Sequence, residues 1–228
     1  MIEFLLLDLD DTILDFLKSE DYGIRKTLKR AGIEPTDAVC ARYSQINKGF
    51  WKQLELGEVT RDQLNVGRFR QLFEELEVVA DAAAAAEDYM ENLSSVHFFL
   101  PGAEETVKRL QKTHRLFIVS NGTASTQQRR LANAKLYPYF EQVFISELVG
   151  VNKPDKLFFD RCFAQIPGFD PEKAMIVGDS LSSDIKGGKN AGIRTCWVNP
   201  KHKTAPEEIR PDYEIEALSQ LEALLETL

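Results

Sequence analysis

Short apolar segments recur along the sequence and predict the strands of a sheet. The clearest are bounded by polar or glycine residues and comprise Phe4–Leu7, Leu116–Val119, Gln142–Ile145, Ala174–Val177 and Thr195–Val198. Segments with helical periodicity lie between the later ones, at Glu104–Lys112, Ser125–Ala134, Lys156–Gln165 and Ser182–Ala191. This alternation predicts an α/β fold of three layers, in which helices cover both faces of a parallel sheet.

The interval from residue 16 to residue 96 breaks this alternation. It shows no strand pattern, and its helical segments are Ser19–Ala31, Asp37–Glu55, Thr60–Leu76 and Asp81–Asn92. We therefore predict that residues 1–15 and 97–228 form the α/β core and that residues 16–96 form an inserted all-helical cap domain. The last segment, Leu218–Leu228, has the pattern of an amphipathic terminal helix.

The net charge, apolar runs and cysteine content limit the kinds of partner and the compartment expected for this protein. The net charge of −8 would repel a phosphate backbone, so nucleic acid is not expected as a main partner. No apolar stretch approaches the length of a membrane span, and the first apolar run is too short for a signal peptide. The three cysteines show no paired spacing, which favours reduced thiols and a cytoplasmic protein without a membrane partner.

Polar side chains follow the predicted strands at the points where the strands end. Ligands of a parallel sheet bind beyond the carboxyl ends of its strands, so these residues form the candidate site. The set consists of Asp8, Asp10, Ser120, Asn121, Lys153, Asp179 and Asp184.

This set is rich in carboxylates, which raise one another's pKa or require a compensating cation. It contains neither His nor Cys, and ligation by oxygen alone indicates a hard ion. A few carboxylates with waters and a substrate phosphate suit Mg²⁺ better than Zn²⁺ or a protein cage for Ca²⁺. The expected cofactor is therefore Mg²⁺.

The spacing of Asp8 and Asp10 places both on one face of an extended backbone, so both carboxyls can approach one substrate. One can attack phosphorus while the other transfers protons. The remaining donors, Ser120, Asn121 and Lys153, can bind and orient the oxygens of a transferring phosphoryl group.

Four ordered motifs resemble those of the haloacid dehalogenase-like (HAD) hydrolase superfamily. They are Asp8-Leu9-Asp10-Asp11-Thr12, Ser120, Lys153, and Gly178-Asp179-Ser180-Leu181-Ser182-Ser183-Asp184. The resemblance covers the whole chain and implies a Rossmann-like core with a helical cap inserted between the first two motifs. It also implies that Asp8 is the nucleophile and a metal ligand, and that Asp10 is the general acid/base and binds the metal through its carbonyl oxygen.

The same resemblance implies roles for the later motifs. Ser120 would bind phosphate, and Lys153 would steady both Asp8 and the phosphate. Asp179 would bind Mg²⁺, and Asp184 would support that ligand or bind through water.

Sequence in the cap and near the strand ends is similar to the bacterial YjjG-type pyrimidine 5'-nucleotidases. It includes Asn47-Lys48-x-x-Trp51, Gly67-Arg68-Phe69 and Thr195-Cys196-Trp197-x-Asn199. Lys48, Trp51 and Arg68 are thus candidate substrate contacts in the cap, although ordinary helix packing or solvation also accounts for such residues.

The leading hypothesis is a Mg²⁺-dependent phosphomonoesterase that hydrolyses a pyrimidine nucleoside 5'-monophosphate through an aspartyl-phosphate at Asp8. The alternatives are a sugar-phosphate phosphatase or mutase, a dehalogenase, and a binding protein without turnover. The dehalogenase is disfavoured because that branch lacks the second acid of the first motif, whereas this chain has Asp10. The expected partner is a small phosphomonoester, and the sequence leaves monomer and homodimer open.

Overall fold

The computed structural model describes residues 1–228, and its internal contacts divide the chain into two units. We call Met1–Phe16 together with His97–Leu228 the core unit, and Leu17–Val96 the helical unit. None of the helices combines the length and the apolar character needed to cross a bilayer.

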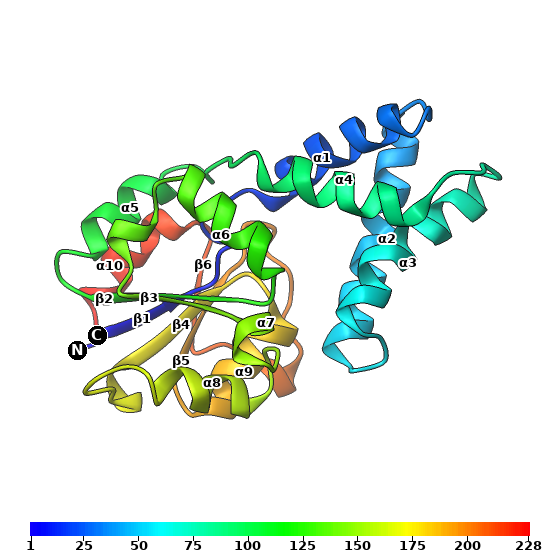
Figure 1. The fold of residues 1–228 in the computed structure, drawn as a ribbon. Helices are drawn as coiled ribbons and strands as arrows, with labels where there is room; N and C mark the ends of the chain where they lie inside the picture. The colour runs from blue at the N-terminus through cyan, green and yellow to red at the C-terminus, as the bar shows by residue number, and fades with distance from the viewer. The chain divides into compact units, whose positions relative to one another are not determined.

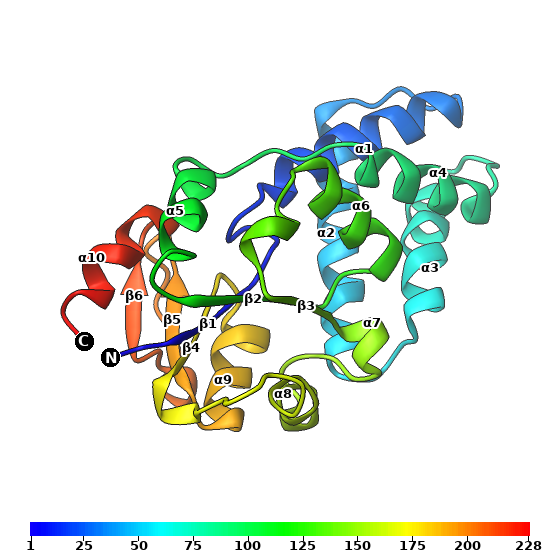
Figure 2. The same ribbon diagram turned by 60° about the vertical axis from the view of Figure 1, so that its left-hand side comes forward.

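The core unit is built on a parallel sheet of six strands in the order β3-β2-β1-β4-β5-β6 (Figures 1 and 2). The strands are β1 (Phe4–Leu7), β2 (Arg115–Ser120), β3 (Gln142–Ile145), β4 (Ala174–Gly178), β5 (Arg194–Val198) and β6 (Tyr213–Ile215). The predicted parallel α/β fold is confirmed. Strand β1 pairs with β2 along one edge and with β4 along the other, and all of its residues are buried.

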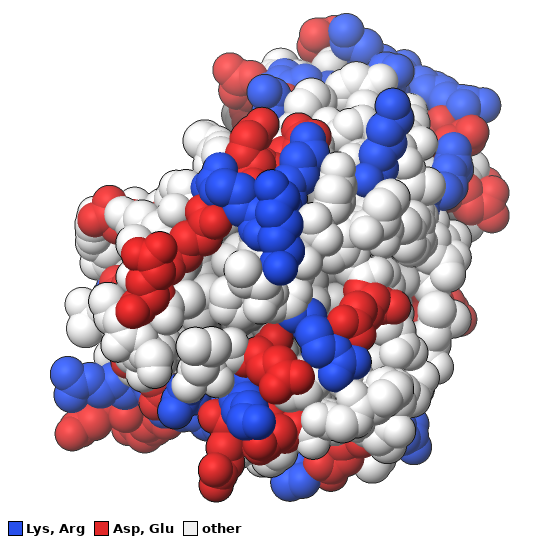
Figure 3. Space-filling view, turned by 90° about the vertical axis from the view of Figure 1, so that its left-hand side faces the viewer, with Lys and Arg blue, Asp and Glu red and all other residues white.

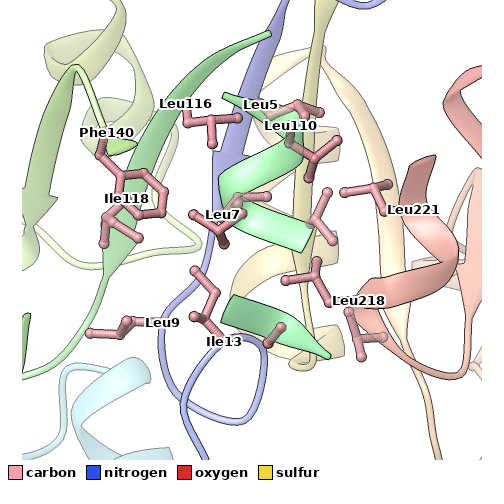
Figure 4. Close-up of a cluster of buried hydrophobic side chains, with 14 of the residues drawn as sticks. Leu5, Leu7, Leu9, Ile13, Leu110, Leu116, Ile118, Phe140, Leu218 and Leu221 are labelled. Carbon is pink, nitrogen blue, oxygen red and sulfur yellow. The ribbon is translucent and has the colours of Figure 1, made fainter. Parts of the chain in front are cut away.

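Alternate residues of the strands enter two separate hydrophobic clusters. Leu5 and Leu7 of β1 pack in one cluster, and Phe4 and Leu6 pack in the other. The first cluster, drawn in Figure 4, includes Leu110, Leu218 and Leu221 from helical segments outside the sheet. This alternation is the two-residue period of a strand, and it explains why continuous apolar runs predicted the sheet.

Helices cover both faces of the sheet (Figure 1). The helices of the core unit are α5 (Ala103–Leu110), α6 (Ala124–Asn133), α7 (Ser146–Val149), α8 (Lys156–Phe163), α9 (Lys186–Ala191) and α10 (Leu221–Leu225). Residues of α5, α6 and α10 join the first cluster, and residues of α8 join the second. The resulting three layers match the predicted architecture.

Three elements differ from the sequence prediction. Strand β6 was not predicted because only two of its three residues are apolar. The segment Leu181–Ile185 is a π-helical turn before α9, with the amide of Ile185 donating to the carbonyl of Ser180. The terminal helix is shorter than predicted, because Leu218–Gln220 form a 3-10 turn and the amides of Thr227 and Leu228 bond to carbonyls only three residues back.

The helical unit consists of α1 (Phe16–Arg30, whose first residue belongs to the core unit), α2 (Asp37–Glu55), α3 (Arg61–Glu75) and α4 (Ala82–Ser94). Short polar residues begin three of these helices. The side chains of Thr36, Thr60 and Asp81 accept hydrogen bonds from the first-turn amides of α2, α3 and α4. Such caps explain why the helix starts could be read from the sequence.

The interior of the helical unit combines aromatic rings with a buried polar network. The ring of Tyr43 lies 5.1 Å from that of Phe69 and 5.4 Å from that of Tyr89, between centroids. Beside them, the Asn47 amide donates to Glu20 (2.6 Å) and its carbonyl oxygen accepts from Arg68 (2.8 Å). The network therefore joins one carboxylate and one guanidinium through a neutral amide.

On the surface, charges of opposite sign lie side by side. Figure 3 shows Lys and Arg interspersed with Asp and Glu over the face that it presents. Ion pairs such as Arg109 with Glu222 (2.6 Å) and Arg115 with Glu141 (2.7 Å) belong to the core unit. Exposed pairs of this kind contribute little stability each.

Candidate active site

The carboxyl ends of the central strands deliver the candidate residues to one edge of the sheet. In the register of the sheet, Leu7 of β1 lies opposite Ile118 of β2 and Val177 of β4. The residues that follow these positions emerge at the same edge, where parallel sheets bind ligands. Asp8 comes directly after β1 and Asp179 directly after β4.

Three carboxylates meet at this edge. One oxygen from each of Asp8, Asp179 and Asp184 lies within 4.8 Å of the others. The carboxylate of Asp10 is bonded to helix α6 instead. One of its oxygens accepts a hydrogen bond from Gln127, and the other accepts one from Arg130. The structure thus separates the two acids of the first motif, one in the carboxylate cluster and one against a helix.

The ammonium of Lys153 lies among the clustered carboxylates and is almost fully buried. It donates to Asp8 (2.7 Å), to Asp184 (2.6 Å) and to the carbonyl oxygen of Val119 (2.7 Å). These bonds use all of its donors. Lys153 is therefore bonded to the side chain of Asp8, and its predicted roles in the reaction stay predictions.

Burial and mutual repulsion perturb the acids. Burial raises the pKa of Asp8 to about 8, the ammonium of Lys153 opposes the shift, and the Asp184 and Asp10 carboxylates add to it. Burial also raises the pKa of Asp179 well above its usual range, with Asp184 and Asp8 adding to the effect. For Lys153, burial opposes the charge, but Asp184 and Asp8 outweigh it and raise the pKa. The site therefore holds more negative charge than it can balance.

The turn after β4 brings Asp184 into the cluster. The backbone amide of Ser180 donates to the Asp184 carboxylate (3.0 Å), and the Ser180 hydroxyl accepts from the Ser183 amide (3.2 Å). A Cβ at position 178 would lie 2.2 Å from an oxygen of Asp184. Only glycine at position 178 allows this close approach of a carboxylate to the backbone.

Ser120 is the last residue of β2, and Asn121 follows it and contacts Lys153. The Asn121 side chain donates to the carbonyl oxygen of Lys153 and accepts from its amide, both at 2.9 Å. The Ser120 hydroxyl oxygen accepts from the backbone of Gly122 (3.1 Å) and from the side chain of Gln127 (2.8 Å). Asn121 thus positions the loop that carries Lys153, while its predicted contact with phosphate stays a prediction.

The donor set of the cluster fits a hard divalent cation. Every candidate ligand atom is a carboxylate oxygen, and no His or Cys belongs to the group. Such a set is typical of Mg²⁺, Ca²⁺ or Mn²⁺ rather than of Zn²⁺. The excess negative charge at buried positions gives an independent reason for a cation here.

The candidate substrate contacts of the helical unit occupy different environments within it. Lys48 is exposed, and Trp51 is partly buried with the Arg61 guanidinium 5.8 Å from its ring centroid. Arg68 is 2% exposed; it donates to Asn47 and lies over the ring of Tyr89 at 4.7 Å. Packing inside the helical unit accounts for these contacts of Arg68, and the predicted substrate roles of all three stay predictions.

Some residues at the site were not singled out from the sequence as side chains of the site. Gln127 and Arg130 reach it from α6, and the indole of Trp197 donates to the carbonyl oxygen of Asp179 (2.8 Å). A polar pair spaced by three residues on a helix is the one signal that could have indicated the first two. Trp197 was noted only as part of the resemblance.

Known proteins are similar to this chain in sequence and in fold. A family model of the haloacid dehalogenase-like hydrolases matches residues 2–192. The HAD-hydrolase YfnB of Bacillus subtilis is 41% identical over 97% of this chain and 94% of its own length. Its crystal structure, bound to magnesium, has a TM-score of 0.94 to this chain and covers 98% of both chains.

Two further relatives are pyrimidine 5'-nucleotidases. PynA of Streptococcus pneumoniae is 39% identical over 96% of this chain and 93% of its own length. YjjG of Escherichia coli is 33% identical over 98% of this chain and 97% of its own length. Because the family model spans most of the sequence and these relatives cover nearly all of it, the chain belongs to the haloacid dehalogenase-like hydrolases.

Proposed function

We propose that this hydrolase is a Mg²⁺-dependent phosphomonoesterase that acts on pyrimidine nucleoside 5'-monophosphates through an aspartyl-phosphate at Asp8. The observation that carries the proposal is the fixed carboxylate of Asp8, bonded to Lys153 within the carboxylate cluster. The similarity to PynA and YjjG supports the substrate class.

Mg²⁺ is the proposed cofactor. Asp8, Asp179 and the main-chain carbonyl of Asp10 would hold it, and Asp184 would support them directly or through water. When bound, the cation supplies positive charge that offsets the carboxylates and the substrate phosphate. The magnesium in the YfnB structure supports this choice of ion.

In the proposed reaction, a carboxylate oxygen of Asp8 attacks phosphorus and the ester bond to the nucleoside breaks. The leaving oxygen takes a proton from Asp10, which then accepts a proton from the water that attacks the aspartyl-phosphate. Inorganic phosphate leaves and the Asp8 carboxylate is restored. Ser120 and Asn121 orient the phosphoryl group during both steps, while Lys153 holds Asp8 and places its positive charge beside the phosphate.

A substrate panel tests the proposal. We expect Mg²⁺-dependent phosphate release from UMP, dUMP and dTMP, with kcat/KM at least about tenfold above that for AMP and for hexose phosphates. Mass spectrometry of the quenched protein during turnover should show one added phosphoryl group, absent from Asp8→Asn. A preference for hexose phosphates would overturn the substrate class, and full activity in excess chelator would overturn the role of Mg²⁺.

A further inference from the structure

Helix α6 presents two buried polar side chains to the site. Gln127 is 2% exposed and Arg130 is 0% exposed, whereas their neighbours Gln128 and Arg129 are exposed. Residues three apart lie on the same face of a helix. The buried pair therefore faces the core, and two residues of the same types face solvent beside it.

Gln127 and Arg130 together form hydrogen bonds with both oxygens of one carboxylate. The Gln127 amide donates to Asp10 Oδ2 (2.6 Å), and a guanidinium nitrogen of Arg130 donates to Asp10 Oδ1. Arg130 also donates to the side-chain oxygen Oε1 of Gln127 (3.0 Å), which ties the two side chains together. Hydrogen bonds at both oxygens leave the carboxyl group of Asp10 little freedom to rotate.

Gln127 also links Asp10 to the predicted phosphate-binding serine. Its amide donates to Ser120 Oγ (2.8 Å), which accepts a second hydrogen bond from the Gly122 amide. With both lone pairs occupied, the hydroxyl of Ser120 has its own hydrogen left to donate elsewhere. A Cβ at position 122 would lie 2.5 Å from the Gln127 amide nitrogen, so glycine makes room for this contact.

The guanidinium of Arg130 is buried, but some of its hydrogen-bond donors have no partner. Its Nε and Nη2 atoms are buried and have no hydrogen-bond partner. A buried charge with unsatisfied donors costs stability, and an apolar side chain of similar length would avoid that cost. The contact with Asp10 is the one ion pair that the structure gives to this guanidinium.

We propose that Gln127 and Arg130 are positioning residues for the reaction, which hold the carboxyl group of Asp10 in the orientation used for proton transfer. This inference rests on the proposed function, because Asp10 acts there as the acid and the base. The pair acts through Asp10 and, in the case of Gln127, through Ser120. Neither residue needs to touch the substrate.

Leaving-group dependence isolates this role. Release of 4-nitrophenol from its phosphate ester needs little help from an acid, whereas release of a nucleoside 5'-hydroxyl needs a proton. The value of kcat/KM reports only the steps up to formation of the aspartyl-phosphate. A displaced Asp10 therefore lowers kcat/KM for a nucleoside monophosphate more than for 4-nitrophenyl phosphate.

The variants are Arg130→Met and Gln127→Met, with Arg129→Met and Gln128→Met as matched controls on the exposed face of the same helix. We expect the ratio of kcat/KM for UMP to that for 4-nitrophenyl phosphate to fall by about tenfold or more in both buried variants. The controls should keep the wild-type ratio, and Arg130→Lys should recover part of it.

Equal losses on the two substrates, or no loss, would overturn the inference and leave a structural role for the pair. Circular dichroism and Tm check that each variant is folded. If Arg130→Met does not fold, the same comparison of the two substrates is made with Gln127→Met and Arg130→Lys. A wild-type protein that released phosphate from neither substrate would overturn the proposed function itself. The two failures are therefore distinguishable.

Discussion

Both units of this protein bury charged side chains, but they balance them in different ways. In the helical unit, Glu20 and Arg68 are joined through Asn47, so one negative and one positive charge share a closed network. In the core unit, the carboxylates of Asp8 and Asp184 pair with the ammonium of Lys153, and Asp179 adds a third carboxylate to the cluster. The first network is complete within the protein, and the second has an excess of negative charge.

The difference separates a structural network from a site. Buried charges of opposite sign that share a hydrogen-bonding partner need no further ligand, although their net contribution to stability is small. A buried cluster with unbalanced charge is costly unless it binds a compensating ligand. Disrupting the network should therefore cost stability that depends on added cation in the core unit but not in the helical unit, which the following variants test.

The largest expected effect is on turnover. Asp8→Asn keeps the shape of the side chain but removes the nucleophile, so kcat should fall by about 10³-fold or more. Phosphate release from UMP measures it, with the exposed Asp160→Asn as a control that should retain full activity. Turnover of Asp8→Asn at the wild-type rate would show that the unbalanced cluster does not contain the nucleophile.

Next in size is the loss of the only cation in the cluster. Lys153→Met leaves buried carboxylates without their ion-pair partner and should lower the free energy of unfolding by about 3–5 kcal/mol. Added MgCl₂ should restore part of this loss, because a bound cation replaces the missing charge. Urea unfolding with and without MgCl₂ measures both, and a loss insensitive to MgCl₂ would contradict the comparison.

In the helical unit, the loss of stability on disrupting the polar network should not depend on MgCl₂. Asn47→Leu leaves the buried carboxylate of Glu20 and the Arg68 guanidinium without their shared partner, at a cost of about 1–3 kcal/mol. We expect the same cost with and without MgCl₂ in urea unfolding. The exposed Gln53→Leu, on the same helix, should cost much less. Recovery of Asn47→Leu by MgCl₂ would remove the distinction between the units.

The strands, helix starts and acids that could be predicted from the sequence are those that a local pattern or the topology of a parallel sheet determines. Strands β1 to β5 are largely buried and read as apolar runs, and Asp8 and Asp179 follow from the rule for strand ends. Threonine and aspartate caps likewise marked the helix starts of the helical unit. Local chemistry and topology were sufficient for these elements.

The contacts of α6 with Asp10 could not be predicted from local patterns or sheet topology. Gln127 and Gln128 are the same residue type at neighbouring positions, as are Arg129 and Arg130, yet one of each pair is buried against Asp10. Polar side chains on helices are solvated by default, so the pattern gave no reason to choose. Only the packing of α6 on the sheet decides which of them reaches the site.

The smallest expected effect concerns an exposed pair of the helical unit. The Arg42 guanidinium and then the Gln71 amide lower the pKa of Glu75 from 4.5 to about 2. Because the folded-state pKa lies below the unfolded one, the stabilisation is complete above about pH 4.5 and is lost as the pH falls toward about 2. Glu75→Gln should therefore lower Tm slightly at about pH 7, and the difference from wild type should shrink at about pH 3. Salt should reduce the effect as well, since exposed pairs are screened. A difference in Tm that grew on acidification would show that Glu75 is held by something other than its charge.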